Sequence, residues 1–153
     1  MDYRKEYEKW LASPALSEDE RAELRALEGN DKEIKARFYG PLEFGTAGLR
    51  GTMYTGLHNM NRHVIRWATQ GFANVIRAEG TEAMQKGIAV CMDCRNHSAE
   101  FARETACVMA ANGIHVRLFE SLRPTPELSF AVREYGCQAG VNVTASHNPK
   151  EYN

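Results

Sequence analysis

The sequence contains no apolar run that approaches the roughly 20 residues of a membrane-spanning helix. It also has little net charge, because 19 Lys and Arg residues stand against 20 Asp and Glu residues, for a formal net charge of -1. No bulk electrostatic attraction to nucleic acid or to a membrane surface is therefore expected. The first residues, MDYRKE, lack the apolar core of a signal peptide. These absences make a cytoplasmic location the default expectation.

Cysteine is scarce as well, with four residues in the chain. In a reducing compartment we expect all four to be free thiols. Cys91 and Cys94 have the C-x-x-C spacing that redox and zinc sites share. However, Cys91 lies inside an apolar run, where cysteine packs as a small hydrophobic residue, and no second matched pair completes a four-ligand site. We favour the packing role.

Residues 1–38 are charged and have helical periodicity, which predicts an N-terminal helical arm in front of a domain over residues 39–153. Ser17 and Glu20 have the spacing of a capping box at the start of one helix. Asn30 is a good cap for another helix, which would carry its apolar side chains toward a core.

The remainder of the chain alternates between helical and strand patterns. A strongly amphipathic helix is expected over 61–80, and His63 and Trp67 on it are interpreted as packing or surface residues. Short apolar runs then predict strands at 87–93, 114–119 and 139–143. Ser98 and Thr125 are expected to cap the helices between these strands. This alternation predicts a three-layer α/β/α domain with a small, mostly parallel mixed sheet.

Polar residues follow each predicted strand, and the carboxyl ends of parallel strands meet at one edge of a sheet. The residues at these ends are Asp93, Arg95, Arg123, Ser146 and His147, with Lys150 just beyond. Arginine offers a planar fork and lysine a point charge to a phosphate. The predicted sheet edge is therefore a cationic basin around one serine.

A glycine-rich stretch, FGTAGLRG at residues 44–51, contains Arg50. Glycines let the backbone approach a ligand closely and turn N–H groups toward an anion. A plain flexible hairpin explains the same composition, and spacing alone leaves both interpretations open. The stretch is not a Walker loop, because no Gly-Lys-Ser/Thr follows it.

Three interpretations of Ser146 compete. A hydrolase nucleophile with His147 as its base is disfavoured, because the G-x-S-x-G elbow is absent. A phosphoryl acceptor is favoured over the hydrolase, because a phosphorylated serine needs cations nearby. A serine that only caps a turn remains open, since Ser, Asn and Pro are all common in turns.

Two motifs resemble a known family. TASHNP at residues 144–149 resembles the phosphoserine signature of the α-D-phosphohexomutase superfamily, which includes phosphoglucomutase and phosphomannomutase. FGTAGLRG resembles the first active-site loop of the phosphoglucomutase–phosphopentomutase branch, and Asp93, Arg95 and the PTP at residues 124–126 also match the family pattern. The resemblance implies that this chain is domain I of a four-domain enzyme and that domains II–IV are absent from it.

The activity that the resemblance implies is interconversion of glucose 1-phosphate and glucose 6-phosphate by an intramolecular phosphotransferase. Ser146 would be the phosphoserine, and glucose 1,6-bisphosphate the intermediate and activator. The Ser146 phosphate would ligate Mg²⁺, whose other ligands are expected in domain II. His147 would contact the transferring group, while Arg50, Lys150 and Arg95 would bind phosphate.

The partners implied are a phosphosugar and the missing domains, with no nucleic acid and no membrane. Alternative substrates are pentose or mannose phosphates, and the alternative from another class is a non-catalytic phosphosugar-binding module. Without the metal loop of the later domains, the chain alone is expected to be inactive as a mutase.

Overall fold

The computed structural model describes residues 1–45 and 48–153. Within them the chain forms two compact units. Unit 1 comprises Met1–Val64 together with Tyr152, and unit 2 comprises Ile65–Glu151 together with Asn153. Thr46 and Ala47 of the glycine-rich stretch lie outside the described residues. No helix in the described ranges is long and apolar enough to cross a membrane.

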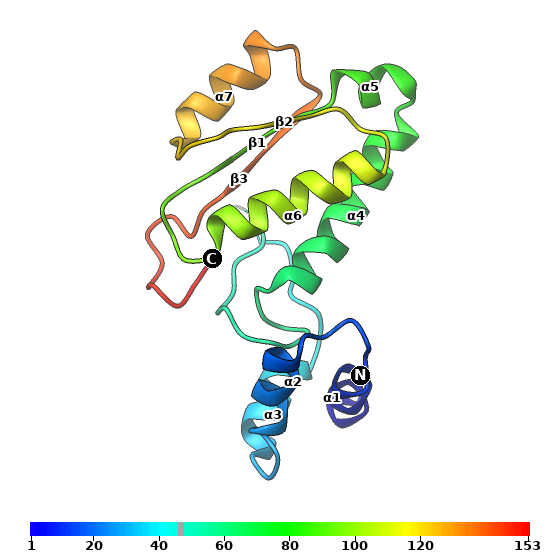
Figure 1. The fold of residues 1–153 in the computed structure, drawn as a ribbon, viewed down its shortest axis with the longest axis vertical. Coiled ribbons are helices and arrows are strands. Elements are labelled where there is room, and N and C mark those ends of the chain that lie inside the picture. Colours follow the sequence, from blue (N-terminus) through cyan, green and yellow to red (C-terminus); the bar gives the residue numbers. More distant parts are fainter. Residues whose placement is uncertain (46–47) are drawn as a thin grey trace. The chain divides into compact units, whose positions relative to one another are not determined.

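Unit 1 begins with three short helices, α1 (Tyr3–Leu11), α2 (Glu18–Arg25) and α3 (Asp31–Phe38), shown in blue to cyan in Figure 1. The capping box predicted for α2 is confirmed: the Ser17 hydroxyl accepts from the Glu20 N–H, and the Glu20 carboxylate accepts from the Ser17 N–H. Asn30 caps α3 by accepting from the backbone of Glu33. The predicted N-terminal helices are therefore present.

The core of unit 1 forms around Phe38, which is fully buried with Leu24. Tyr7 and Trp10 of α1 pack edge-on against the Phe38 ring, with centroid distances of 5.7 and 5.8 Å. Edge-to-face contacts of this kind are favoured by the quadrupoles of the rings. Apolar side chains from all three helices thus share one cluster, which stabilises helices too short to be stable alone.

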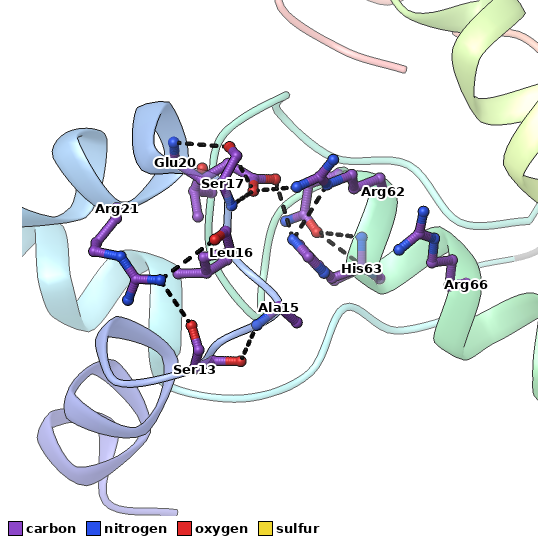
Figure 2. A network of polar contacts seen from close by, with 12 residues as sticks. Ser13, Ala15, Leu16, Ser17, Glu20, Arg21, Arg62, His63 and Arg66 are labelled. Atoms are coloured by element: carbon purple, nitrogen blue, oxygen red, sulfur yellow. Dashed lines mark hydrogen bonds and ion pairs between the residues drawn. The ribbon is translucent and has the colours of Figure 1, made fainter.

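A polar network surrounds the start of α2 (Figure 2). The Glu20 carboxylate accepts from the Arg62 guanidinium at 2.6 Å and lies 3.1 Å from the His63 ring. Burial opposes ionisation of Glu20, but hydrogen bonds from Ser17 and Arg62 outweigh it and hold the pKa of this carboxyl below its usual value. His63 also contacts the Trp10 ring edge-on, which agrees with the first of its two predicted roles, packing or surface.

Unit 2 contains a parallel sheet of three strands, β1 (Ile88–Met92), β2 (Val116–Leu118) and β3 (Ala139–Val143). Their order is β2-β1-β3, so β1 lies in the centre and all five of its residues are buried. Both pairings described, β1 with β2 and β1 with β3, are parallel. The predicted α/β class and all three strands are confirmed.

Helices cover both faces of this sheet (Figure 1). They are α6 (Ser98–Ala111) and α7 (Thr125–Glu134), which both contact β1, while α4 (Arg62–Ala78) and α5 (Thr81–Lys86) precede β1 in the chain. Ala89 and Cys91 of β1 pack against Leu128 of α7. Residues between them on β1 point to the opposite face, which α6 covers. α5 had no counterpart in the sequence analysis, because its six residues are too few to carry a recognisable period.

Two predicted helix caps are wrong. Ser98 is the first residue of α6 rather than its cap, and its hydroxyl donates to the Asp93 carboxylate at 2.7 Å. Thr125 is likewise the first residue of α7, and its hydroxyl accepts from the Asn142 side chain at 2.5 Å. Both hydroxyls instead bind polar side chains near the carboxyl ends of β1 and β3. Those side chains need hydrogen-bond partners, and a hydroxyl that capped its own helix could not also bind them.

Candidate functional site

Ser146 lies in the loop that follows β3, here named the serine loop and comprising residues 144–150. Its backbone is left-handed, with φ of 52°, and its side chain is exposed. The preceding residue, Ala145, is fully buried and anchors the loop to unit 2. A non-glycine residue in this conformation persists only where its surroundings hold it there. The serine loop therefore presents one hydroxyl to solvent on a fixed backbone.

Asp93, directly after β1, holds the beginning of the serine loop. One carboxylate oxygen accepts from the Thr144 hydroxyl at 2.6 Å, and the Thr144 oxygen in turn accepts from the Ser146 N–H at 2.9 Å. The other carboxylate oxygen accepts from the Ser98 hydroxyl at 2.7 Å and from the Arg95 N–H at 2.9 Å. The Asp93 carboxylate is thus linked to the Ser146 backbone through one threonine.

Asp93 remains ionised because of these contacts. Burial raises the pKa of its carboxyl, but hydrogen bonds from Thr144, Ser98 and the Arg95 backbone, together with the Arg95 charge, outweigh burial. The pKa of Asp93 is therefore held below its ordinary value of 3.8. Both carboxylate oxygens are engaged in hydrogen bonds, so Asp93 serves as a structural acceptor.

Arg95 holds the middle and end of the serine loop. One terminal nitrogen of its guanidinium donates to the Ser146 and Asn148 carbonyls at 2.8 and 2.7 Å, and the other donates to the Pro149 carbonyl at 3.1 Å. The loop is also closed internally by a hydrogen bond from the Asn148 N–H to the Ala145 carbonyl at 2.9 Å. The Arg95 fork is thus occupied by backbone oxygens.

The other predicted basin residues differ in their placement. The His147 ring is exposed, and its Nδ1 lies 3.3 Å from the Ser146 hydroxyl. Lys150 is exposed at the end of the serine loop. Arg123 forms an ion pair with Glu127 of α7 at 2.7 Å. The structure therefore brings together Asp93, Arg95, Ser146 and His147.

Arg50, which the resemblance also implies as a phosphate-binding residue, belongs to unit 1. It is exposed and lines a pocket of about 230 Å³ whose other polar residues include Thr52, Asn59 and Tyr152 of the same unit. The Asn59 amide donates to the Thr52 hydroxyl at 2.9 Å. Gly45 and Gly48, on either side of Thr46 and Ala47, exchange backbone hydrogen bonds at 3.0 and 3.2 Å. Gly45 and Gly48 are thus paired as an isolated antiparallel bridge.

The sequence matches one family over most of its length. Residues 41–153 match the family described as phosphoglucomutase/phosphomannomutase, alpha/beta/alpha domain I. The chain belongs to this family.

Proteins similar to this chain carry one of two enzyme names. Phosphopentomutase from Pongo abelii is 41% identical over 132 residues, which are 82% of this chain and 22% of that protein. Phosphopentomutase from Mus musculus is 35% identical over 151 residues, which are 95% of this chain and 24% of that protein. Phosphoglucomutase from Staphylococcus saprophyticus is 40% identical over 123 residues, which are 80% of this chain and 22% of that protein. The chain spans about a fifth of the length of these curated relatives, and no solved structure matches it significantly.

Three residues of the domain I site escaped the sequence analysis. By sequence, Thr144 is only the first residue of the TASHNP motif, and Ser98 has the position of a helix cap. Asn153 is nearly fully buried, and its amide donates to the Asn96 carbonyl at 3.0 Å and to the Ser98 hydroxyl at 2.8 Å. The sequence signal that points to these three residues is Asp93 at the end of a buried strand, because a carboxylate there needs several hydrogen-bond donors.

The Cys91 thiol is not part of the site that Asp93, Arg95, Ser146 and His147 form. Cys91 is buried in β1, and burial together with the negative charges of Glu127 and Asp93 raises its pKa to about 11. Its thiol is therefore protonated at neutral pH and donates to the Asn142 side chain at 3.2 Å. The predicted packing role of Cys91 is confirmed by its contact with Leu128.

Magnesium has few candidate ligands in this part of the family fold. In residues 1–45 and 48–153, no group of three or more His, Cys, Asp or Glu side chains is placed to hold a metal ion. Asp93 is the carboxylate that contacts the serine loop, and both of its oxygens already accept hydrogen bonds. A phosphate on Ser146 would add ligand oxygens, but the several that Mg²⁺ requires would have to come from elsewhere.

Proposed function

We propose that this chain is the phosphoserine-bearing domain of a cytoplasmic phosphosugar mutase, in which Ser146 carries the phosphoryl group. The observation that supports this proposal is the exposed Ser146 hydroxyl on a left-handed backbone, with hydrogen bonds on both sides of the residue. A turn that used Ser146 only as a cap would direct the hydroxyl back to the backbone. The hydroxyl here faces solvent beside His147 and is available to a substrate.

The proposed reaction begins with phosphoserine at position 146. A hydroxyl of the sugar monophosphate attacks the phosphorus, the bond from the serine oxygen to phosphorus breaks, and a sugar bisphosphate forms. The proton lost by the sugar hydroxyl is matched by one gained by the serine oxygen. Transfer of the other phosphoryl group from the bisphosphate to Ser146 then releases the isomeric monophosphate and regenerates phosphoserine.

His147 is the residue best placed to move the serine proton. Its Nδ1 lies 3.3 Å from the Ser146 hydroxyl, which is close to hydrogen-bonding distance. We propose that His147 takes the proton when Ser146 is phosphorylated and returns it when the phosphoryl group leaves. Lys150 and, from the glycine-rich stretch, Arg50 are kept in the proposal as phosphate-binding cations.

Magnesium belongs to the proposal only as an ion that oxygens of the Ser146 phosphate would ligate. When bound, it would neutralise negative charge on the transferring phosphoryl group. The proposed roles of Ser146 and His147 do not depend on where its other ligands lie.

The proposed substrates are glucose 1-phosphate and glucose 6-phosphate, with glucose 1,6-bisphosphate as the intermediate and activator. Pentose phosphates are the second candidate, because relatives named phosphopentomutase are as similar to this chain as those named phosphoglucomutase. Initial rates of the natural protein on glucose 1-phosphate, ribose 1-phosphate and mannose 1-phosphate would rank the candidates. A higher kcat/KM for ribose 1-phosphate than for glucose 1-phosphate would reject the glucose assignment.

The phosphoserine itself is tested by mass spectrometry of the protein purified from its own cells. We expect a phosphopeptide with the modification on Ser146, and incubation with a sugar monophosphate should remove it. A Ser146→Ala variant should lose both the phosphate and turnover while still binding a phosphosugar, and Ser129→Ala, at another exposed serine, should change neither. A natural protein with Ser146 unmodified and no mutase turnover would leave the phosphosugar-binding module as the better explanation.

A further inference from the structure

We propose that Arg95 is a positioning residue for phosphoryl transfer, which fixes the serine loop from within and is not itself a phosphate ligand. This inference rests on the proposed function of Ser146 and assigns Arg95 a role different from the phosphate binding that the sequence predicted. It concerns how one hydroxyl is kept in a reactive position.

The contacts of Arg95 support this assignment. Its two terminal nitrogens donate to three carbonyl oxygens of one short loop, those of Ser146, Asn148 and Pro149, at 2.7 to 3.1 Å. A planar guanidinium holds such a fork of acceptors in a fixed geometry. To bind a phosphate with the same fork, Arg95 would have to release these carbonyls, which would then need other donors.

The backbone of Ser146 needs this restraint. A left-handed conformation is unfavourable for serine, and the Ser146 carbonyl is one of the three oxygens that Arg95 holds. On the other side of the residue, its N–H is held by Thr144 and through it by Asp93. Both peptide groups of Ser146 are thus hydrogen-bonded to side chains, which together favour the left-handed state.

Arg95 is itself fixed by the same carboxylate. Its backbone N–H donates to Asp93, whose other oxygen holds Thr144. Asp93 and Arg95 therefore act on the serine loop from its two ends, and both follow β1, the buried central strand. A rigid strand end is the best foundation for a group that must be placed accurately.

Removal of Arg95 should therefore affect transfer more than binding. A displacement of about 1 Å of a reacting group can cost on the order of 100-fold in rate. We expect Arg95→Ala in the natural protein to lower kcat 30- to 100-fold, as an order of magnitude from that relation, with KM for the sugar phosphate changed less than about threefold. Arg95→Lys, which supplies one nitrogen in place of a fork, should recover only part of the rate.

Hydrogen exchange tests whether Arg95 restrains the serine loop, and the measurement does not require enzymatic activity. In the 153-residue chain, Arg95→Ala should speed exchange of the Ser146 and Asn148 amides at least tenfold, because these amides are hydrogen-bonded inside the loop. Amides of β1 should exchange as in the wild type. Arg103→Ala, which removes an exposed arginine of α6, is the matched control and should change neither the loop exchange nor kcat.

The outcomes separate this inference from the proposed function. If the wild-type protein carries no phosphate on Ser146 and has no turnover, the proposed function fails whatever the exchange data show. If Ser146 is phosphorylated but Arg95→Ala raises KM at least tenfold with unchanged kcat and unchanged loop exchange, Arg95 is a phosphate ligand and the inference is overturned. If Arg95→Ala does not fold, Arg95→Lys decides between the same two results.

Discussion

At the scale of single residues, the backbone conformation that places the Ser146 hydroxyl lowers the free energy of unfolding. Its left-handed backbone is unfavourable for any residue with a Cβ atom, yet hydrogen bonds from Arg95 and to Thr144 maintain it. Backbone strain of this kind is found more often at functional sites than elsewhere. This destabilisation should be measurable as a difference in the free energy of unfolding between two variants that lack the hydroxyl.

We expect Ser146→Gly to be more stable than Ser146→Ala by about 1 kcal/mol, because glycine adopts a left-handed backbone without the steric penalty. Both variants lack the Ser146 hydroxyl, so the comparison isolates the effect of the backbone conformation. Urea unfolding of the 153-residue chain would measure it. Equal stability of the two variants would show that the loop leaves this conformation in solution.

Asp93 makes the stability of the site dependent on pH. Its pKa is lower in the folded protein than the ordinary 3.8, so its stabilising effect is fully present above that value and is lost as pH falls through the lower folded pKa. We expect Asp93→Asn to destabilise unit 2 at pH 6, with the difference from wild type shrinking below pH 3.8. Urea unfolding of the wild type and Asp93→Asn, at pH 6 and at one pH below 3.8, would measure this difference. A difference that stays constant between the two pH values would contradict the role of the ionised carboxylate.

At the scale of secondary structure elements, β3 and α7 pack so closely that no side chain fits between them at Gly140. A Cβ atom there would lie 2.7 Å from the Cγ2 atom of Val132 and 3.2 Å from the side chain of Leu128. Both neighbours belong to α7, which covers β1 and β3. The position of the strand that leads to Ser146 thus depends on a glycine.

Gly140→Ala should destabilise the chain by about 1–3 kcal/mol, the usual cost of overpacking. Gly71→Ala is the matched control, because Gly71 lies inside α4 with open space where a Cβ would be placed. This control should stabilise the chain by about 0.5–1 kcal/mol. Thermal unfolding of both variants would compare them. A neutral Gly140→Ala would mean that α7 can shift away from the sheet.

The prediction of elements was most accurate where one pattern dominated. β3 was predicted with its observed bounds, because an apolar run between two turn signals admits few alternatives. The caps at Ser98 and Thr125 were wrong for a physical reason. A hydroxyl at a helix start has the same local sequence whether it caps the helix or bonds to a distant carboxylate or amide.

At the scale of the whole molecule, the chain covers about a fifth of the length of its relatives. Phosphoryl transfer requires many groups that neutralise charge around one phosphorus atom. We expect the 153-residue chain alone to show no conversion of glucose 1-phosphate into glucose 6-phosphate, because a phosphate on Ser146 would by itself offer Mg²⁺ fewer oxygen ligands than the ion requires. A coupled assay for glucose 6-phosphate would measure this. Turnover that scales with chain concentration and disappears in Ser146→Ala would contradict the expectation.

The sequence alone determined the α/β class, the three strands and the position of Ser146 after the last of them. These features follow from periodicity and from short motifs, which are local properties of the chain. Only the tertiary structure decided what Arg95 and Asp93 do. Their partners lie about fifty residues away, at Ser146 and Thr144, and the pairing of β1 with β3 brings them together. Local sequence cannot specify which of several donors a half-buried carboxylate such as Asp93 will bind, because that choice depends on the distances set by packing.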